Sequence, residues 1–182
     1  MRILVIGGAG YIGSITSAAL VRKGHEVIVF DNLSRGHKEA VPEAAKFIVG
    51  DLAKQDNIDE ALALCPDVVM HFAALIEVGE SVKNPSLYFA NNLTNSLRLL
   101  DSMLAHKIGR FVFSSTAAVY GEPPSSPIDE SFPLAPTSPY GDSKLAVEKV
   151  LSSYSQAYPF NYVSLRYFNA SGATDERGED HH

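Results

Sequence analysis

The sequence contains little of several features that would by themselves identify a class of protein. Cysteine occurs only once in 182 residues, at Cys65, so no internal disulfide can form and a reducing compartment, the cytoplasm, is expected. No apolar run approaches the roughly 20 residues of a membrane-spanning helix, and no secretory signal is recognisable. Lys and Arg are outnumbered 15 to 21 by Asp and Glu. Neither nucleic acid nor a membrane is therefore expected as a partner.

The sequence does contain a glycine-rich turn near its beginning. Arg2 to Ile6 is almost wholly aliphatic, which indicates a strand buried on both faces. Gly7, Gly10 and Gly13 follow, and an apolar helical pattern begins at about residue 14. In such a turn, backbone N–H groups and a helix N-terminus can approach an anion closely. We therefore expect the pyrophosphate of a dinucleotide to bind here.

Strands and helices alternate along the rest of the chain. Further strands are expected at 26–30, 46–50, 66–71, 110–113 and 161–166, and helices at 14–23, 52–64, 84–106 and 139–158. Residues 121–137 are rich in Pro and Ser and are expected to form an ordered loop of the kind that covers a substrate. This alternation predicts an α/β fold, a doubly wound parallel (Rossmann) sheet with strand order 3-2-1-4-5-6.

Polar residues follow several of the expected strands. Asp31 is placed to bind the adenosine ribose and to repel a 2′-phosphate, which favours NAD over NADP, although Arg35 could accommodate that phosphate. Asp51 is expected to lie beside the adenine, to cap the next helix, or to do both. His71 is expected to be packed at a strand end rather than catalytic. Of the adjacent Asn91 and Asn92, one is expected to face inward, because Asn is unusual inside a helix.

A second set of residues indicates proton chemistry. Ser138 and Pro139 are expected to start a helix, and Tyr140 and Lys144 then lie one turn apart on the same face. A neighbouring ammonium and a positive nicotinamide ring would lower the pKa of the phenol toward the range of a useful base. Thr116, at the end of a strand, can supply a hydroxyl opposite. No metal site is expected, and His181-His182 is too short to indicate one.

These segments together resemble the extended short-chain dehydrogenases/reductases, the NAD-dependent epimerase/dehydratase family, and within it the enzymes that epimerise UDP-hexoses. The matching segments run through the whole chain in family order: Gly-Gly-Ala-Gly-Tyr-Ile-Gly13, Asp31-Asn-Leu, His71-Phe-Ala-Ala, Val78-Gly-Glu-Ser, Asn91-Asn, Ser114-Ser-Thr-Ala-Ala-Val-Tyr-Gly121, Ser138-Pro-Tyr-Gly-Asp-Ser-Lys144 and Leu165-Arg-Tyr-Phe-Asn169.

The resemblance implies roles for individual residues. Tyr140 would be the catalytic base, Lys144 would modulate it and anchor the nicotinamide ribose, and Thr116 would hold the substrate oxygen. The substrate would contact Thr116, Tyr140 and Asn169. The residues implied to bind NAD are Gly7, Gly10, Tyr11, Ile12, Gly13, Asp31, Asn32, Asp51, Leu52, Phe72, Ala73, Ala74, Asn91, Ser114, Tyr140, Lys144 and Tyr167.

The implied reaction is epimerisation at C4 of a UDP-hexose, such as UDP-glucose or UDP-galactose, through a 4-keto intermediate. UDP-N-acetylglucosamine and UDP-glucuronate remain possible substrates, and a non-catalytic NAD-binding domain remains a second class. Sister dehydratases carry Asp-Glu where this chain has Ala117-Ala118, which favours epimerisation. Two departures are Thr116, where many epimerases have Ser, and Ile76, where some have Lys. Homodimerisation is plausible for this family.

The length of the chain departs most from the family pattern. Residues 1–172 are expected to form the NAD-binding domain, and residues 173–182 to begin a substrate-binding region that is otherwise missing. The 182-residue chain alone is therefore expected to bind NAD weakly and not to epimerise a sugar.

Overall fold

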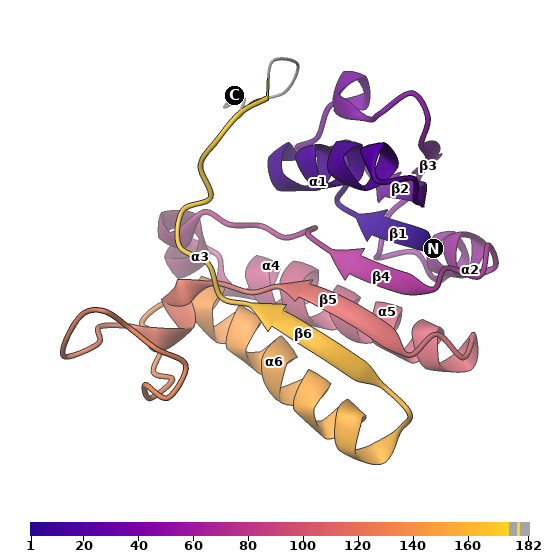
Figure 1. Ribbon diagram of the computed structural model, residues 1–182. Helices are drawn as coiled ribbons and strands as arrows, with labels where there is room; N and C mark the ends of the chain where they lie inside the picture. The colour runs from indigo at the N-terminus through magenta and orange to yellow at the C-terminus, as the bar shows by residue number, and fades with distance from the viewer. Residues whose placement is uncertain (175–177, 179–182) are drawn as a thin grey trace.

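The computed structural model describes residues 1–174 and 178. One parallel sheet of six strands runs through the molecule: β1 (Arg2–Ile6), β2 (Glu26–Asp31), β3 (Lys46–Val49), β4 (Val68–His71), β5 (Arg110–Ser114) and β6 (Asn161–Leu165). Their order is β3-β2-β1-β4-β5-β6, so the predicted topology is confirmed (Figure 1). The carboxyl ends of all six strands therefore meet at one edge of the sheet, where ligands bind in folds of this type.

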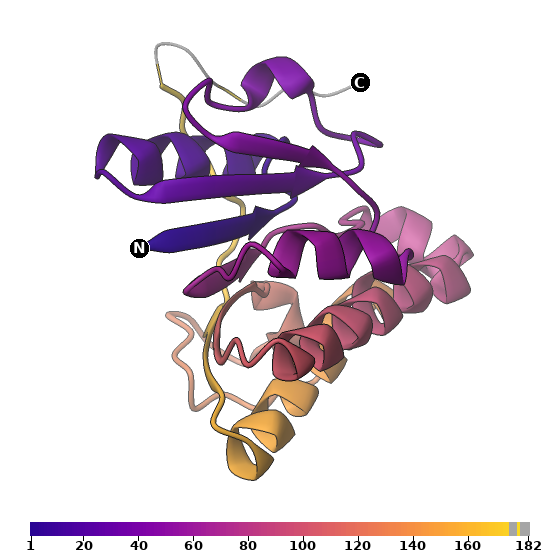
Figure 2. The ribbon, with the colours of Figure 1, turned by 90° about the vertical axis from the view of Figure 1, so that its right-hand side faces the viewer.

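Helices cover the two faces of the sheet unequally. Leu20 and Val21 of α1 (Tyr11–Arg22) pack against β1 and β2 on one face. On the other face a larger core joins the sheet to α2 (Gln55–Leu62), α5 (Asn95–Ala105) and α6 (Pro139–Ala157), which lie together on one side of the sheet in Figure 2. The view of Figure 1 shows β4, β5 and β6 from the α1 side, with α5 and α6 behind them. None of the helices in the described part of the chain is long and apolar enough to span a membrane.

The first helix begins earlier than we expected. It starts at Tyr11 rather than near residue 14, because Gly10 is already extended (φ −80°, ψ 177°) and serves as the N-cap. The helix ends at Arg22 and Gly24 follows in the left-handed region at φ +79°, as expected for a residue just past a helix C-terminus. Tyr11, Ile12 and Gly13 therefore belong to the first helical turn and not to the loop.

The helix after β3 corrects a second expectation. Asp51 does not cap α2, because that helix starts at Gln55 with Lys54 as its N-cap residue. The Asp51 carboxylate instead accepts a hydrogen bond of 2.8 Å from the N–H of Ala53 and so stabilises the turn between β3 and the helix. Its side chain stays at the strand end, where the alternative role beside an adenine remains open.

The single helix expected over 84–106 is divided in the structure. It comprises α4 (Pro85–Tyr88), a π-helical segment η2 (Phe89–Thr94) and α5. A short helix, α3 (Val78–Lys83), precedes it and was missed. Leu87, which we expected on the apolar face of this helix together with Asn91, Thr94, Leu97 and Leu100, is exposed, whereas Tyr88 and Asn92 are buried.

The segments around residues 115–138 agree better with the sequence. Residues 121–137 contain no helix or strand, as expected, but a short 3-10 helix, η3 (Ala117–Tyr120), precedes them. The hydroxyl of Ser138 accepts a hydrogen bond from the N–H of Gly141 and caps α6. A further 3-10 helix, η1 (Lys38–Ala40), lies between β2 and β3.

Candidate functional site

The glycine turn brings the end of β1 against the end of β4. Gly7 is in the left-handed region (φ +75°), and a Cβ there would lie 2.5 Å from the backbone nitrogen of Ala73. Gly13 packs equally closely, since its Cβ would lie 2.1 Å from the carbonyl oxygen of Gly7. The N–H groups of Tyr11 and Ile12, in the first turn of α1, have no partner within the helix. The turn therefore offers N–H donors that have no partner in the helix, next to backbone atoms that no side chain covers.

Asp31 connects this turn to the end of β2. One of its carboxylate oxygens accepts a hydrogen bond of 3.0 Å from the N–H of Ala9, and the other accepts one of 2.8 Å from the N–H of Leu33. The residue is 8% exposed. A carboxylate has about four acceptor positions, so two remain for a ligand such as a ribose diol. Asp31 thus orders the loop as well as offering acceptors.

A cavity of about 720 Å³, its open mouth included, lies over the turn. The cavity is lined by Ile6, Gly7, Gly10, Phe30, Asp31, Asn32, Ser34, Arg35, Gly36, Gly50, Asp51, Leu52, Phe72, Ala73, Ala74, Leu75, Asn91 and Asn95.

Ten of the residues implied to bind NAD line this cavity, and they come from the ends of β1, β2, β3 and β4 and from η2: Gly7, Gly10, Asp31, Asn32, Asp51, Leu52, Phe72, Ala73, Ala74 and Asn91. The other eight lining residues were not among those implied to bind NAD, and Leu75 and Asn95 are two of them. Asn95 lies one helical turn beyond Asn91, and Leu75 directly follows Ala74, so both could have been found from helical spacing and chain continuity.

Other implied residues lie outside the cavity. Tyr11 and Ile12 line a second hollow together with residues 170–174, and the Tyr11 hydroxyl donates to the carbonyl of Gly172. Asn169, implied to touch the substrate, is exposed on the segment after β6. His181 and His182, and most of the expected start of a substrate region at 173–182, lie outside the described residues.

Thr116, Tyr140 and Lys144 come together at the carboxyl end of β5. The hydroxyl of Thr116 lies close enough to the Tyr140 phenol to lower the pKa of that group. Lys144 is 3% exposed, and its Nζ donates a hydrogen bond of 2.9 Å to the carbonyl of Ser114 and lies 4.9 Å from the centre of the Phe113 ring. Tyr140 and Lys144 both lie in α6, four residues apart, and so share one face of that helix as we expected.

The acidities of these groups differ from the expectation. Burial lowers the pKa of Lys144 to about 7. Burial also raises the pKa of Tyr140 above its ordinary value, and the Thr116 hydroxyl opposes this only in part. In the protein alone, desolvation of the phenolate outweighs the attraction that we expected from a neighbouring ammonium. The lowered pKa predicted for Tyr140 is thus not a property of these side chains by themselves.

Ser114 and Tyr167 form a contact next to the same group. Their hydroxyls hydrogen-bond to each other, and the backbone N–H of Ala117 donates a hydrogen bond of 3.0 Å to the carbonyl of Tyr167. Burial raises the pKa of Tyr167, so that it stays a neutral phenol. The segment after β6 is therefore held against the segment that carries Thr116.

His71 is packed, as expected. It is 2% exposed and packs beside the rings of Phe111 and Phe113, and burial together with the charge of Lys144 lowers its pKa to about 3. The Ser96 hydroxyl donates to the carbonyl of Asn92 (2.6 Å), so it accepts from His71 Nε2 (2.9 Å). The ring is neutral and carries its proton on Nε2.

Asn92 is the inward-facing member of its pair. Its amide accepts a hydrogen bond from the N–H of Leu75 and donates to the carbonyl of the same residue, both at 2.9 Å. It also donates to the hydroxyl of Ser143, the neighbour of Lys144. Asn92 therefore joins the loop after β4 to α6. Within the described residues no group of three or more His, Cys, Asp or Glu side chains could hold a metal ion.

The fold and the position of the cavity define a doubly wound α/β domain with a ligand site at the carboxyl ends of its strands. The model of the NAD dependent epimerase/dehydratase family matches residues 3–182, and the chain belongs to that family.

Similar proteins agree with this assignment. A UDP-glucose 4-epimerase of Halalkalibacterium halodurans is 50% identical over 184 aligned residues, which cover 100% of this chain and 55% of the relative. The crystal structure of the Brucella ovis UDP-glucose 4-epimerase in complex with NAD is 44% identical with a TM-score of 0.96, covering 99% of this chain and 56% of that one.

A third similar protein is the UDP-glucose 4-epimerase of Bifidobacterium longum, whose crystal structure is a complex with NAD⁺ and UDP. It is 39% identical, with a TM-score of 0.94 over 99% of this chain and 57% of that one. The chain thus spans about half the length of the curated relatives that it matches.

Proposed function

We propose that this chain is the NAD-binding part of an enzyme that inverts the configuration at C4 of a UDP-hexose. The observation that carries the proposal is the meeting of the Thr116 and Tyr140 hydroxyls beside buried Lys144, at the same sheet edge as the glycine-turn cavity. The names of the relatives support it, since they are UDP-glucose 4-epimerases, two of them with NAD in their crystal structures.

The residues present fit NAD. The close approach of Gly7 to Ala73 leaves a backbone cradle that a Cβ would fill, and the first turn of α1 offers N–H donors to a pyrophosphate. Asp31 has acceptor positions left for the ribose. Residues 1–172 would accordingly form the cofactor domain, with 173–182 as the start of the substrate region.

Tyr140 would take the proton of the sugar 4-hydroxyl while Thr116 holds the same oxygen. Bound NAD would supply the hydride acceptor and a positive ring that favours the Tyr140 phenolate. Lys144, fixed through Ser114, has further N–H groups to donate toward a ribose. Substrate contacts by Asn169, NAD contacts by Tyr11, Ile12, Gly13, Ser114 and Tyr167, homodimerisation and a cytoplasmic location stay predictions.

The segment after Thr116 argues against dehydration. Ala117 and Ala118, which begin η3, carry only methyl side chains. They therefore offer no acid or base where a dehydratase would need one. A non-catalytic NAD-binding domain would have no use for Thr116, Tyr140 and Lys144 at the end of one strand. The residues that bind the sugar determine which UDP-hexose is the substrate. Assays with UDP-glucose, UDP-N-acetylglucosamine and UDP-glucuronate would identify it.

A chimera tests the proposal. Residues 1–182 would be joined to the C-terminal part of the Halalkalibacterium halodurans relative that this chain does not match. We expect the chimera to interconvert UDP-glucose and UDP-galactose, and Tyr140→Phe to lower kcat by at least about 10²-fold while NAD stays bound, because the base is lost but the cradle is not.

Three measurements decide the outcome: a coupled assay of UDP-galactose formation, NAD content and the activity of the 182-residue chain alone. That chain should bind NAD weakly and turn over no sugar. Unchanged turnover in Tyr140→Phe would contradict the role of the phenol. Robust turnover by residues 1–182 alone would contradict the proposed division into domains.

A further inference from the structure

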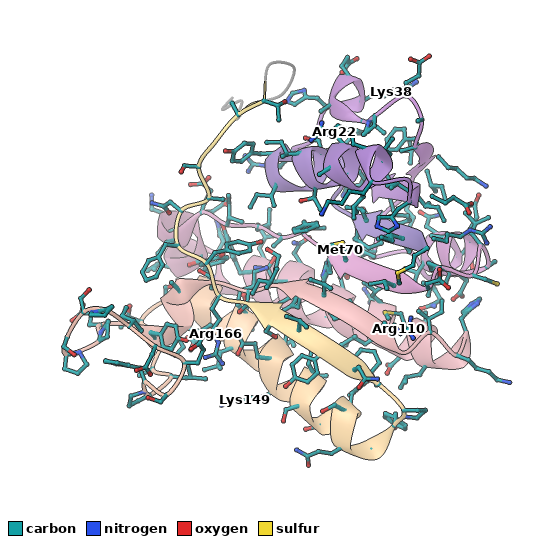
Figure 3. All side chains as sticks on the ribbon, in the orientation of Figure 1. Arg22, Lys38, Met70, Arg110, Lys149 and Arg166 are labelled. Carbon is teal, nitrogen blue, oxygen red and sulfur yellow. The ribbon has the colours of Figure 1, made fainter. Side chains whose placement is uncertain are left out.

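An ion pair that none of the roles above uses joins buried Glu148 to partly buried Arg166 next to the segment that carries Thr116. Glu148 is on α6, one turn beyond Lys144, so Tyr140, Lys144 and Glu148 share one face of the helix. Arg166 directly follows β6 and precedes Tyr167 (Figure 3). The pair therefore connects the helix that carries the phenol to the end of the neighbouring strand.

The two side chains meet through several hydrogen bonds. Arg166 Nη2 donates to Glu148 Oε2 at 2.6 Å, and Arg166 Nε lies 3.0 and 3.1 Å from the two carboxylate oxygens. The side chains are 21% and 8% exposed. A guanidinium held in this way against a carboxylate has a defined direction as well as charge.

The ion pair also contacts both ends of the segment that carries Thr116. The hydroxyl of Ser115, the residue before Thr116, donates to Glu148 Oε1. Arg166 Nη1 donates a hydrogen bond of 3.0 Å to the hydroxyl of Tyr120, at the end of η3, and the guanidinium lies 5.2 Å from the centre of that ring. Thr116 thus lies between two residues that the same ion pair anchors.

We propose that Glu148 and Arg166 are positioning residues that hold the Thr116 hydroxyl against the Tyr140 phenol. Glu148 fixes Ser115 relative to the helix of Tyr140, and Arg166 fixes Tyr120 on the other side. Their consequence for catalysis rests on the proposed function, whereas their effect on the geometry of the two hydroxyls does not.

The architecture gives a reason for charges here. Desolvation makes a buried ion pair a poor source of stability, and apolar side chains of similar volume often serve a core as well. Apolar side chains cannot, however, fix a hydroxyl on each of two segments. The directional contacts to Ser115 and Tyr120 are what only the ion pair provides.

The test removes both charges together, in Glu148→Leu/Arg166→Met, so that no lone charge stays buried. The readout is the ¹³Cζ resonance of Tyr140 at neutral pH in the 182-residue chain, identified by its loss in Tyr140→Phe. Thr116→Val gives the displacement caused by losing the Thr116 hydroxyl. We expect the double variant to move the resonance in the same direction as Thr116→Val.

The matched control is Arg2→Met/Glu26→Leu, which removes the exposed ion pair at the other end of the strands (2.8 Å). It should leave the Tyr140 resonance in place. If the buried double variant does not fold, Arg166→Lys, which keeps the charge but not the forked contacts, replaces it and should give a partial displacement. A folded variant of either kind with an unchanged Tyr140 resonance overturns the proposal.

Activity supplies an independent second reading. In the chimera, loss of the ion pair should lower kcat about 10²-fold, as small misplacements of reacting groups do, with little change in KM. A chimera without any epimerase activity would contradict the proposed function, but the Tyr140 resonance would still decide the positioning role.

Discussion

At Gly7 the chain leaves β1 for the cofactor turn, and two separate demands exclude a side chain. The residue adopts φ +75°, and a Cβ would lie 2.5 Å from the nitrogen of Ala73. Gly24, beyond α1, shares the first demand with φ +79° but has nothing within 4 Å of its Cβ position. The two glycines therefore separate backbone strain from steric exclusion.

We predict that Gly7→Ala is far more damaging than Gly24→Ala. The latter introduces only left-handed strain of about 1–2 kcal/mol. Gly7→Ala adds a clash that must displace the end of β4, so it should cost more free energy of unfolding and also abolish NAD binding. Urea unfolding and NAD titration of both variants measure this, and equal losses in the two would refute the steric argument.

Lys144 couples the site to pH through its burial. Its pKa falls from an ordinary 10.5 to about 7 in the folded protein. Between these values the unfolded chain binds one more proton than the folded one, so the free energy of unfolding rises with pH. The contribution is present above 10.5 and is lost as the pH falls to about 7. For His71, whose pKa falls from 6.5 to about 3, the free energy of unfolding rises with pH between these two values.

We predict that Lys144→Met flattens the stability profile between about pH 7 and pH 9. In the unsubstituted chain Lys144 should contribute a slope of up to about 1.4 kcal/mol per pH unit in this range. Lys149→Met, on the exposed part of the same helix, is the control and should leave the slope unchanged. Urea unfolding at several pH values measures both, and a Lys144→Met profile as steep as the parent would show that the lysine is not the source.

At the scale of elements, α4, η2 and α5 show where local pattern is insufficient. The polar and apolar spacing indicated one helix, and the chain is helical there, but a π-helical segment divides it. Asn92, within that segment, is held by Leu75 and Ser143, which lie 17 and 51 residues away in sequence. The sequence predicted that one Asn faces inward; which one, and with which partners, depends on tertiary contacts.

The same distinction applies to the site. The strand order and the placement of Tyr140 and Lys144 four residues apart within one helix follow from residue types and helical spacing, and these are confirmed. The raised pKa of Tyr140 could not be predicted, because desolvation sums over neighbours from several elements. The Glu148–Arg166 pair is equally hidden, since an acid in α6 and a base after β6 have no local signature.

At the scale of the whole molecule, one row of side chains crosses the sheet, from positions buried under α1 to exposed positions on β6. Val29, Val5, Met70, Val112 and Val163 are register partners on β2, β1, β4, β5 and β6, and they share the face on which α1 packs. Val29 is 0% exposed and Val163 is 52% exposed. Parallel sheets normally have both faces covered, so the β4–β6 half of this face differs from the rest.

This row yields a prediction about how stability is distributed. Val29→Thr buries a hydroxyl under α1, where it loses its hydrogen bonds to water and gains none in return. We expect this change to lower the free energy of unfolding by about 1–3 kcal/mol. Val163→Thr makes the same chemical change on the open half and should stay within about 0.5 kcal/mol of the parent. Urea unfolding of the 182-residue chain measures both. Equal destabilisation would mean that Val163 is covered in solution and would contradict an open face.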